Sequence, residues 1–304
     1  MMIQSDETMP RRSGQQGLWV LAAVAMSLVL LASCGDDDEP NDPSPDSGTQ
    51  VDGGVTDSGT PDSGTGSEDG GTETDAGTGD GGTTPQTCGP SEVICKEQSI
   101  DKLDLLTVVS TGNMSEEGTT SGEFLSYVDA RAGGLTPTMS YTYVRFTPQG
   151  LQRVQIDDQA ALGSTEWDLA FRRYTMRVNS GTSGASCVSV AQTAEGTTFA
   201  SVTSVDTAWT FNKEAWYDNA CTFIADDVLG GALTQLGSYF RYEGCLAMTG
   251  KVFVIRLADG RHVKFEVVSY YEPSVQTACN DTGSLPSGTP SGSGQFRVKW
   301  AFLP

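Results

Sequence analysis

Residues 251–271 read Lys251-Val-Phe-Val-Ile-Arg-Leu-Ala-Asp-Gly-Arg-His-Val-Lys-Phe-Glu-Val-Val-Ser-Tyr-Tyr271, and this stretch decides the fold class. Two apolar runs flank Asp259-Gly260, a dipeptide that favours a tight turn because Gly readily adopts positive φ. In the second run apolar and polar side chains alternate, which predicts a strand with one buried and one polar face. His262 falls on the polar face. The stretch therefore predicts an antiparallel β-hairpin.

Similar runs rich in Val, Thr, Tyr and Phe occur elsewhere and are separated by Gly, Ser, Asn and Pro. Examples are residues 103–109, 141–146, 167–178 and 295–302. Helical periodicity is rare; we expect one short helix at 224–236, with acidic residues at its N-terminus. No internal repeat is visible in the sequence, which argues against a β-helix. The pattern as a whole predicts an all-β, antiparallel domain.

The N-terminus resembles a bacterial lipoprotein signal. Two arginines precede an apolar run at 18–31, which is short for a membrane span. The run ends in Leu31-Ala32-Ser33-Cys34, which looks like a lipobox; the alternative is an ordinary secretory signal. We predict that residues 1–33 are a signal peptide and that Cys34 carries lipid, palmitate included. The mature lipoprotein would then be anchored in a membrane, as expected at the outer membrane or cell surface.

The formal charge of −21 is concentrated in one segment. Residues 35–87 contain fourteen acidic residues and no Lys or Arg, whereas residues 88–304 carry a net charge of −7. The acidic segment consists mainly of Gly, Ser, Thr, Asp and Pro, so it cannot bury enough apolar surface to fold. We expect residues 34–87 to be a lipidated N-terminus and disordered linker before one domain at 88–304. Nucleic acid is not an expected partner of so acidic a chain.

Six cysteines remain when Cys34 is set aside: Cys88, Cys95, Cys187, Cys221, Cys245 and Cys279. An even number in an exported protein predicts three disulfides that stabilise the domain. The pairing that we expect is Cys88–Cys95, Cys187–Cys221 and Cys245–Cys279. The sequence has no C-x-x-C motif and only one histidine, so we predict no zinc site of the usual kind.

Three pieces of the domain, taken in order, resemble the HmuY family of exported haem-binding lipoproteins. The first is Trp167-Asp-Leu-Ala-Phe-Arg-Arg-Tyr174, which continues to Asn179-Ser-Gly181 and Ser183-Gly184. The second is the stretch 251–271, and the third is the closing strand that begins at Ser293-Gly-Gln295. The resemblance covers most of 100–304 and implies an HmuY-like β domain that binds haem and passes it to an outer-membrane receptor. We interpret the first piece as a set of fold determinants that do not contact a ligand.

The resemblance also implies where haem would bind. In the best-known member two histidines hold the iron, and they lie in the interval that corresponds to residues 182–250. This interval of the present chain contains no histidine, and His262 is the only histidine of the sequence. Bis-histidine ligation within one chain is therefore impossible. Because haem iron also accepts thioether and phenolate ligands, Met248 and Tyr242 are the candidate ligands.

Two functions remain open from the sequence. If haem or another tetrapyrrole binds, we expect a deep apolar cleft near residues 215–250, with Trp216 and Phe240 as walls. The alternative is a non-catalytic surface module for a protein, a glycan or another small ligand, in which this region is filled. The sequence contains neither a phosphate-binding loop nor a nucleophile elbow, and one histidine is weak support for a catalytic triad. We therefore predict that the chain is not an enzyme.

Overall fold

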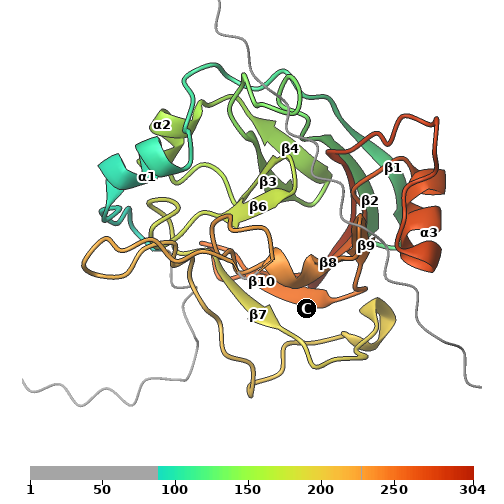
Figure 1. Ribbon diagram of the computed structural model, residues 1–304. Coiled ribbons are helices and arrows are strands. Elements are labelled where there is room, and N and C mark those ends of the chain that lie inside the picture. The colour runs from blue at the N-terminus through green and yellow to red at the C-terminus, as the bar shows by residue number, and fades with distance from the viewer. Residues whose placement is uncertain (1–87, 227) are drawn as a thin grey trace, which may run out of the picture. The chain divides into compact units, whose positions relative to one another are not determined.

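The computed structural model describes residues 88–226 and 228–304 (Figure 1). The predicted signal peptide at 1–33, the linker at 34–87 and the lipid-attachment residue Cys34 lie outside the described residues. Among the helices of the described residues, none combines the length and the apolar composition that a membrane span needs.

The domain is built mainly of antiparallel strands. The strands are β1 (Met114–Thr120), β2 (Glu123–Asp129), β3 (Thr142–Thr147), β4 (Gly150–Val154), β5 (Leu169–Arg172), β6 (Thr175–Val178), β7 (Ser189–Gln192), β8 (Phe240–Tyr242), β9 (Leu246–Met248), β10 (Val252–Arg256), β11 (His262–Ser269) and β12 (Gln295–Leu303). The helices are α1 (Lys96–Lys102), α2 (Asp158–Leu162), α3 (Pro273–Thr282) and the 3-10 helices η1 (Phe199–Ser201) and η2 (Gly237–Tyr239). The strand order is β1-β2-β12-β11-β10-β7 in the large sheet, β4-β3-β5-β6 in the second sheet and β8-β9 in a separate ribbon. These sheets confirm the predicted antiparallel all-β class.

The hairpin predicted at residues 251–271 is present in the centre of the large sheet. Strand β10 pairs with β11 in antiparallel register, with Val252 opposite Glu266 and Arg256 opposite His262. The turn requires Gly260, whose φ is 84°. Strand β11 pairs on its other side with the closing strand β12. The two pieces of sequence that carried the family resemblance at the C-terminal end are therefore neighbours in one sheet.

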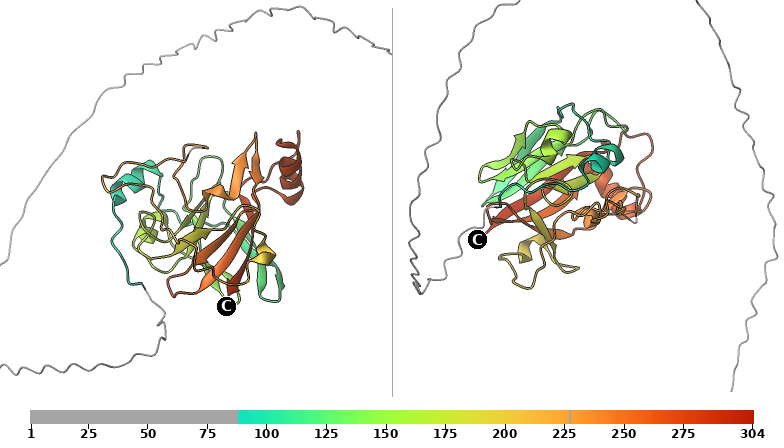
Figure 2. Two further views of the ribbon diagram at one scale, coloured as in Figure 1. Left: turned by 90° about the horizontal axis from the view of Figure 1, so that it is seen from below. Right: turned by 90° about the vertical axis from the view of Figure 1, so that its left-hand side faces the viewer.

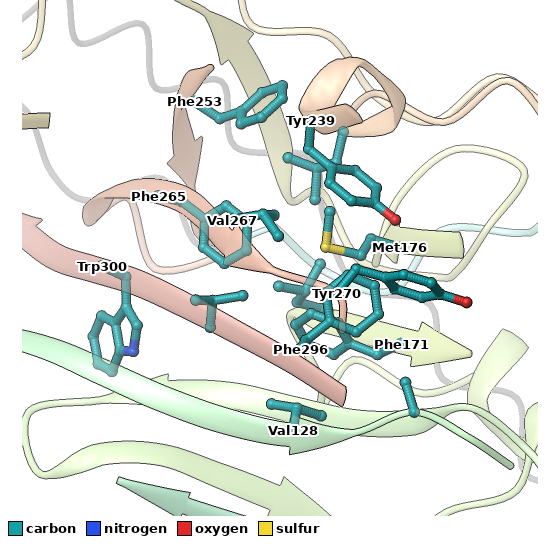
Figure 3. Close-up of a cluster of buried hydrophobic side chains, with 14 of the residues drawn as sticks. Val128, Phe171, Met176, Tyr239, Phe253, Phe265, Val267, Tyr270, Phe296 and Trp300 are labelled. Carbon is teal, nitrogen blue, oxygen red and sulfur yellow. The ribbon is translucent and has the colours of Figure 1, made fainter. Parts of the chain in front are cut away.

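The two larger sheets pack face to face and enclose the main hydrophobic core (Figure 3). Ring centroids of Phe146 on β3 and Trp300 on β12 lie 5.0 Å apart, and those of Phe171 on β5 and Phe296 on β12 lie 5.2 Å apart. Burying each such ring contributes about 2–3 kcal/mol of hydrophobic free energy. Figure 3 shows that Tyr239 of η2, which belongs to neither sheet, also enters this core.

The first family motif contributes to two clusters: Leu169 and Phe171 belong to the main core, and Trp167 belongs to a second buried cluster. Trp167 is fully buried, and its Nε1 donates to Ala161 O at 2.9 Å. Asn179 is also fully buried; its Nδ2 donates to Trp167 O at 2.8 Å, and its Oδ1 accepts from Ser186 N at 3.1 Å. Both side chains thus tie loops to the sheet, which gives them a structural role.

All six cysteines of the domain form disulfides, but two of the three predicted pairs are wrong. The pairs are Cys88–Cys187, Cys95–Cys221 and Cys245–Cys279, with Cα–Cα distances of 6.0, 5.4 and 6.1 Å. Backbone pairing explains the first correction, because Ser91 N donates to Ala185 O at 2.7 Å and brings the N-terminal segment to residue 187. Helix α1 explains the second, since Tyr217 Oη donates to Gln98 O at 2.9 Å and places Cys95 beside Cys221. Only the Cys245–Cys279 pair is confirmed.

Three predicted elements also differ from the structure. Residues 103–109 run as turns and loop, and Asp104 adopts a φ of 48° that is incompatible with a strand. Residues 167–178 contain two short strands, because Arg173 adopts a φ of 52° and turns the chain between them. The described residues of 224–236 form turns and one isolated bridge, Ala225–Ala232, instead of a helix. Side-chain hydrogen bonds to the backbone, described below, compete with helix formation there.

The polar face predicted for the hairpin is partly covered. Lys264 is only 8% exposed, and its Nζ donates to Glu123 Oε1 and to Phe199 O, both at 3.2 Å. The segment that contains η1 packs over this outer face together with Trp209 and Phe211. Helices α1 and α2 lie at one side of the domain and α3 lies at the other (Figures 1 and 2). The ribbon β8-β9 lies beside α3, to which Cys245–Cys279 fastens it.

Candidate functional site

An apolar pocket of about 400 Å³ lies where the turn between β5 and β6 meets the segment before β8. We call it the apolar pocket. Its lining residues are Tyr174, Thr175, Gln192, Asp226, Val228, Ala232, Leu233, Thr234, Gly237, Ser238, Phe240 and Thr249. Most of them belong to the predicted cleft region, residues 215–250. Its volume falls in the range of about 300–1,000 Å³ that is usual for small-molecule sites.

Two aromatic rings form the rigid wall of the apolar pocket. The ring of Tyr174 meets that of Phe240 edge to face, with 6.3 Å between centroids. Tyr239 fixes both: its Oη donates to Tyr174 O at 2.8 Å, and its ring lies 4.8 Å from that of Phe240. Tyr239 itself is 2% exposed and packs 5.8 Å from Phe296 in the main core. The wall is therefore continuous with the core of the sandwich.

The opposite wall is a tight loop organised by Asp226. Its Oδ1 accepts hydrogen bonds from Val228 N at 2.8 Å and Leu229 N at 2.6 Å, which closes a turn. The base of the loop is held by a bridge between Ala225 and Ala232. Large apolar side chains on this loop are left exposed: Val228 (54%), Leu229 (37%) and Leu233 (45%). A wall of exposed apolar side chains beside a hollow can cover an apolar ligand.

The hydroxyl end of Tyr174 lies close to Asp226. A Cβ built on Gly231 would lie 2.9 Å from Asp226 Oδ2 and 3.4 Å from Tyr174 Oη, so both side chains converge on this glycine. Burial raises the pKa of Tyr174, and the charge of Asp226 raises it further. The phenol is therefore neutral at physiological pH and available as a hydrogen-bond donor.

A second hollow adjoins the apolar pocket, and we call it the polar groove. It measures about 810 Å³ and is lined by Ala194, Glu195, Gly196, Thr197, Thr198, Phe199, Ala200, Ser238, Arg241, Thr249, Gly250, Lys251 and Glu266. Ser238 and Thr249 line both hollows and form the ridge between them. Thr249 Oγ1 donates to Ser238 O at 2.9 Å, which ties the two sides of this ridge together.

Met248 and Tyr242, the predicted iron ligands, lie on the ribbon β8-β9. Met248 pairs with Phe240 and packs against the main core, and its backbone N donates to Asn280 Oδ1 at 2.8 Å. Tyr242 pairs with Leu246 at the other end of the ribbon and is 51% exposed. Among the described residues that line the apolar pocket, neither is present. The structure thus places both near the pocket but not in its wall.

Two further predicted residues lie elsewhere. Trp216 is not a wall of the pocket: it is fully buried, and its Nε1 donates to Glu214 Oε2 at 3.3 Å. The backbone N of Trp216 donates to Thr182 Oγ1 at 2.7 Å, which fixes Trp216 beside the loop at residue 182 and outside the pocket lining. His262 begins β11, with its ring 5.4 Å from that of Phe211. Burial lowers the pKa of His262, and Arg256 adds to the effect.

Tyr174, Val228 and Leu233 line the pocket but were not predicted from the sequence. The motif that contains Tyr174 was interpreted as one strand of fold determinants, and Tyr174 is separated from the buried residues of β5 only by Arg173. The turn at Arg173 redirects the chain, so that Tyr174 points into the pocket. In the sequence, apolar residues alternate up to Phe171, and this alternation breaks at Arg172-Arg173. That break was the available signal for the turn.

The described residues contain no cluster of three His, Cys, Asp or Glu side chains that could hold a metal ion. The lining of the apolar pocket offers aromatic and aliphatic contacts, with Tyr174, Asp226 and Gln192 as polar groups. This combination suits a flat, largely apolar small molecule.

Comparison with known proteins gives one family match. A model described as HmuY protein matches residues 137–282, a span that runs from before β3 to the end of α3 and contains the apolar pocket. The match confirms the predicted resemblance to the HmuY family over this span. That family is not one of enzymes, which agrees with the prediction for this chain. Among curated proteins the search found no match.

Solved structures with a similar chain include proteins from three bacteria. An HmuY-like protein described as heme-binding, from Bacteroides vulgatus, is 15% identical with a TM-score of 0.40, covering 62% of this chain and 97% of that one. The apo HmuY analog of Tannerella forsythia is 16% identical with a TM-score of 0.31, covering 66% and 99%. A protein from Bacteroides fragilis described as a lipoprotein is 14% identical with a TM-score of 0.39, covering 61% and 94%.

Proposed function

Because residues 137–282 match the HmuY family, we propose that this chain is a surface lipoprotein that binds haem or a related tetrapyrrole in the apolar pocket and passes it on. The observation that carries the proposal is the pocket itself. Tyr174 and Phe240 present an aromatic wall to the hollow, and Val228 and Leu233 face it from the opposite loop. An extended aromatic macrocycle gains both burial and ring contacts between two such walls.

Iron coordination would differ from bis-histidine ligation. The pKa of Tyr174 is raised, so its phenol is a poor source of the phenolate that iron prefers. Met248 needs no deprotonation, and Tyr242 is exposed on the same ribbon, so we propose these two as the side chains to test for coordination. Most of the affinity then comes from burial of the macrocycle, and a metal-free porphyrin would bind nearly as well as haem.

Attachment to a membrane belongs to the same proposal. Acylation at Cys34 would anchor the chain, and residues 35–87 would let the domain reach a receptor in the outer membrane. Mass spectrometry of the mature N-terminus tests this part. A diacylglyceryl-modified Cys34 supports it, and an unmodified terminal residue contradicts it.

The haem proposal is tested by titrating the purified protein with hemin and, separately, with protoporphyrin, while the Soret band is recorded. We expect a saturable shift that Phe240→Ala weakens about tenfold, since the variant loses one ring contact. Phe211→Ala is the matched control, because Phe211 is a partly buried ring on the outer face of the large sheet. No saturable shift with the wild-type protein would refute the proposal and favour the alternative, a surface module for another ligand.

Coordination is tested by spectra of the hemin complex. Met248→Ala or Tyr242→Phe should change the absorption of the bound iron, whereas His262→Ala should not, because His262 lies beside Phe211 outside the pocket. If His262→Ala abolishes the shift, the assignment of the ligands is wrong.

A further inference from the structure

We infer that the polar groove holds the carboxylate edge of the tetrapyrrole, with Arg241 and Lys251 as its cationic partners; this inference rests on the proposed function. Haem carries two carboxylate side chains on one edge of an apolar ring system. A site for it therefore needs an apolar hollow that opens onto cations. The apolar pocket and the polar groove meet this requirement, because they share Ser238 and Thr249 as a common ridge.

Strand geometry explains why the two hollows differ in chemistry. Successive side chains of a strand point to opposite sides. On β8, Phe240 lines the apolar pocket, and the next residue, Arg241, lines the polar groove. Lys251 follows Thr249 by two residues, and its backbone N donates to Thr249 Oγ1 at 3.2 Å. Both cations therefore start from the elements that separate the two hollows.

Both cations have donors to offer. Arg241 Nε donates to Glu243 Oε1 at 2.9 Å, which leaves the terminal nitrogens of the guanidinium for another anion. With other described residues Lys251 forms no ion pair. A planar guanidinium and a flexible ammonium can each approach one of two carboxylates on a ligand edge.

The groove also contains two acidic residues, which lie on other elements. Glu195 belongs to the loop that leads to η1, and Glu266 lies on β11. Burial raises the pKa of Glu266, and the charge of Lys299 acts in the opposite direction. Val252, the residue that follows Lys251, pairs with Glu266, whereas Arg241 lies on β8, outside the large sheet.

The experiment compares hemin with hemin dimethyl ester, whose carboxylates are blocked, in one detergent-containing buffer. The variant is Arg241→Gln together with Lys251→Gln; both residues lie at the surface, so the fold is expected to persist, as circular dichroism can verify. Arg261→Gln is the matched control: Arg261 is 44% exposed and paired with Asp259 at 2.7 Å, much as Arg241 is 50% exposed and paired with Glu243.

We expect the double variant to bind hemin about fivefold more weakly and to bind the ester as the wild type does, because two exposed ion pairs are lost only with the diacid. Added salt should weaken hemin binding to the wild type and have less effect on the variant. Equal loss in Arg261→Gln, or unchanged hemin affinity in the double variant, would overturn the inference while leaving haem binding in place. Absence of any hemin binding to the wild type would overturn both.

Discussion

Removing the Cys95–Cys221 disulfide should lower the free energy of unfolding, and the size of the loss should depend on whether the Cys88–Cys187 disulfide is present. Both cysteines of the first pair are only partly buried, so replacing them with Ala leaves no large cavity. The cost then comes mainly from the entropy that the unfolded chain regains. The bridge joins residues 126 positions apart, and closing such a loop alone corresponds to about 5 kcal/mol.

The second bridge shortens this loop. While Cys88–Cys187 is present, the unfolded chain already connects residue 95 to residue 221 through the stretches 88–95 and 187–221, a path of about 41 residues. For a loop of that length the same relation gives a closure free energy of about 4 kcal/mol. Removing Cys95–Cys221 should therefore cost about 1 kcal/mol more in a background that lacks Cys88–Cys187 than in the wild type.

Equilibrium unfolding in urea measures these free energies, and the m-value should rise as bridges are removed because the unfolded state expands. The control background lacks Cys245–Cys279, whose loop of 34 residues does not overlap the other two. There the cost of removing Cys95–Cys221 should equal that in the wild type. A cost below about 1 kcal/mol in the wild type, or the same cost in all three backgrounds, would refute the entropic reasoning.

Two further predictions concern stability. Gly184→Ala should destabilise the protein by about 1–3 kcal/mol in thermal unfolding, because the new Cβ would overlap Asn179 Oδ1 and lie 2.8 Å from Trp167 Cζ2. Gly89→Ala is the control and should be nearly neutral, because its Cβ would meet no other atom. An unchanged melting temperature for Gly184→Ala would contradict the prediction. Burial raises the pKa of Asp168 to about 6, so its contribution to stability is complete below pH 4 and is lost as the pH rises through 6. Asp168→Asn keeps an oxygen that accepts from Phe146 N. Its free energy of unfolding in urea, relative to that of the wild type, should increase by on the order of 3 kcal/mol between pH 4 and pH 7. Parallel pH profiles for the two proteins would contradict this.

The central hairpin was predictable because its information is local. Alternation with a period of two and an Asp-Gly turn specify β10 and β11 without reference to the rest of the chain. The closing strand β12 was predictable for the same reason. Strand β1 was not predicted, since it is mostly exposed and carries little apolar pattern.

The apolar pocket was predictable only in its approximate position. Phe240 was expected as a wall and is one, but Tyr174 reaches the pocket through a turn that depends on the positive φ of Arg173. The opposite wall depends on Asp226, whose side chain closes a turn where periodicity indicated a helix. The disulfides depend on contacts between segments about 100 residues apart, which spacing along the chain does not encode.

The hydrogen bond from Tyr239 Oη to Tyr174 O makes the two walls of the apolar pocket mechanically unequal. Moving the backbone of the aromatic wall would disturb Tyr239, which is buried in the main core, and would therefore expose apolar surface. The Asp226 loop rests on turn hydrogen bonds and exposed side chains, so it can open by itself at a much lower free energy. Shape selection would then be set by the rigid side, whereas the rate of ligand entry and release would be set by the loop. Substitutions could change how fast a ligand is exchanged without changing which ligand is chosen.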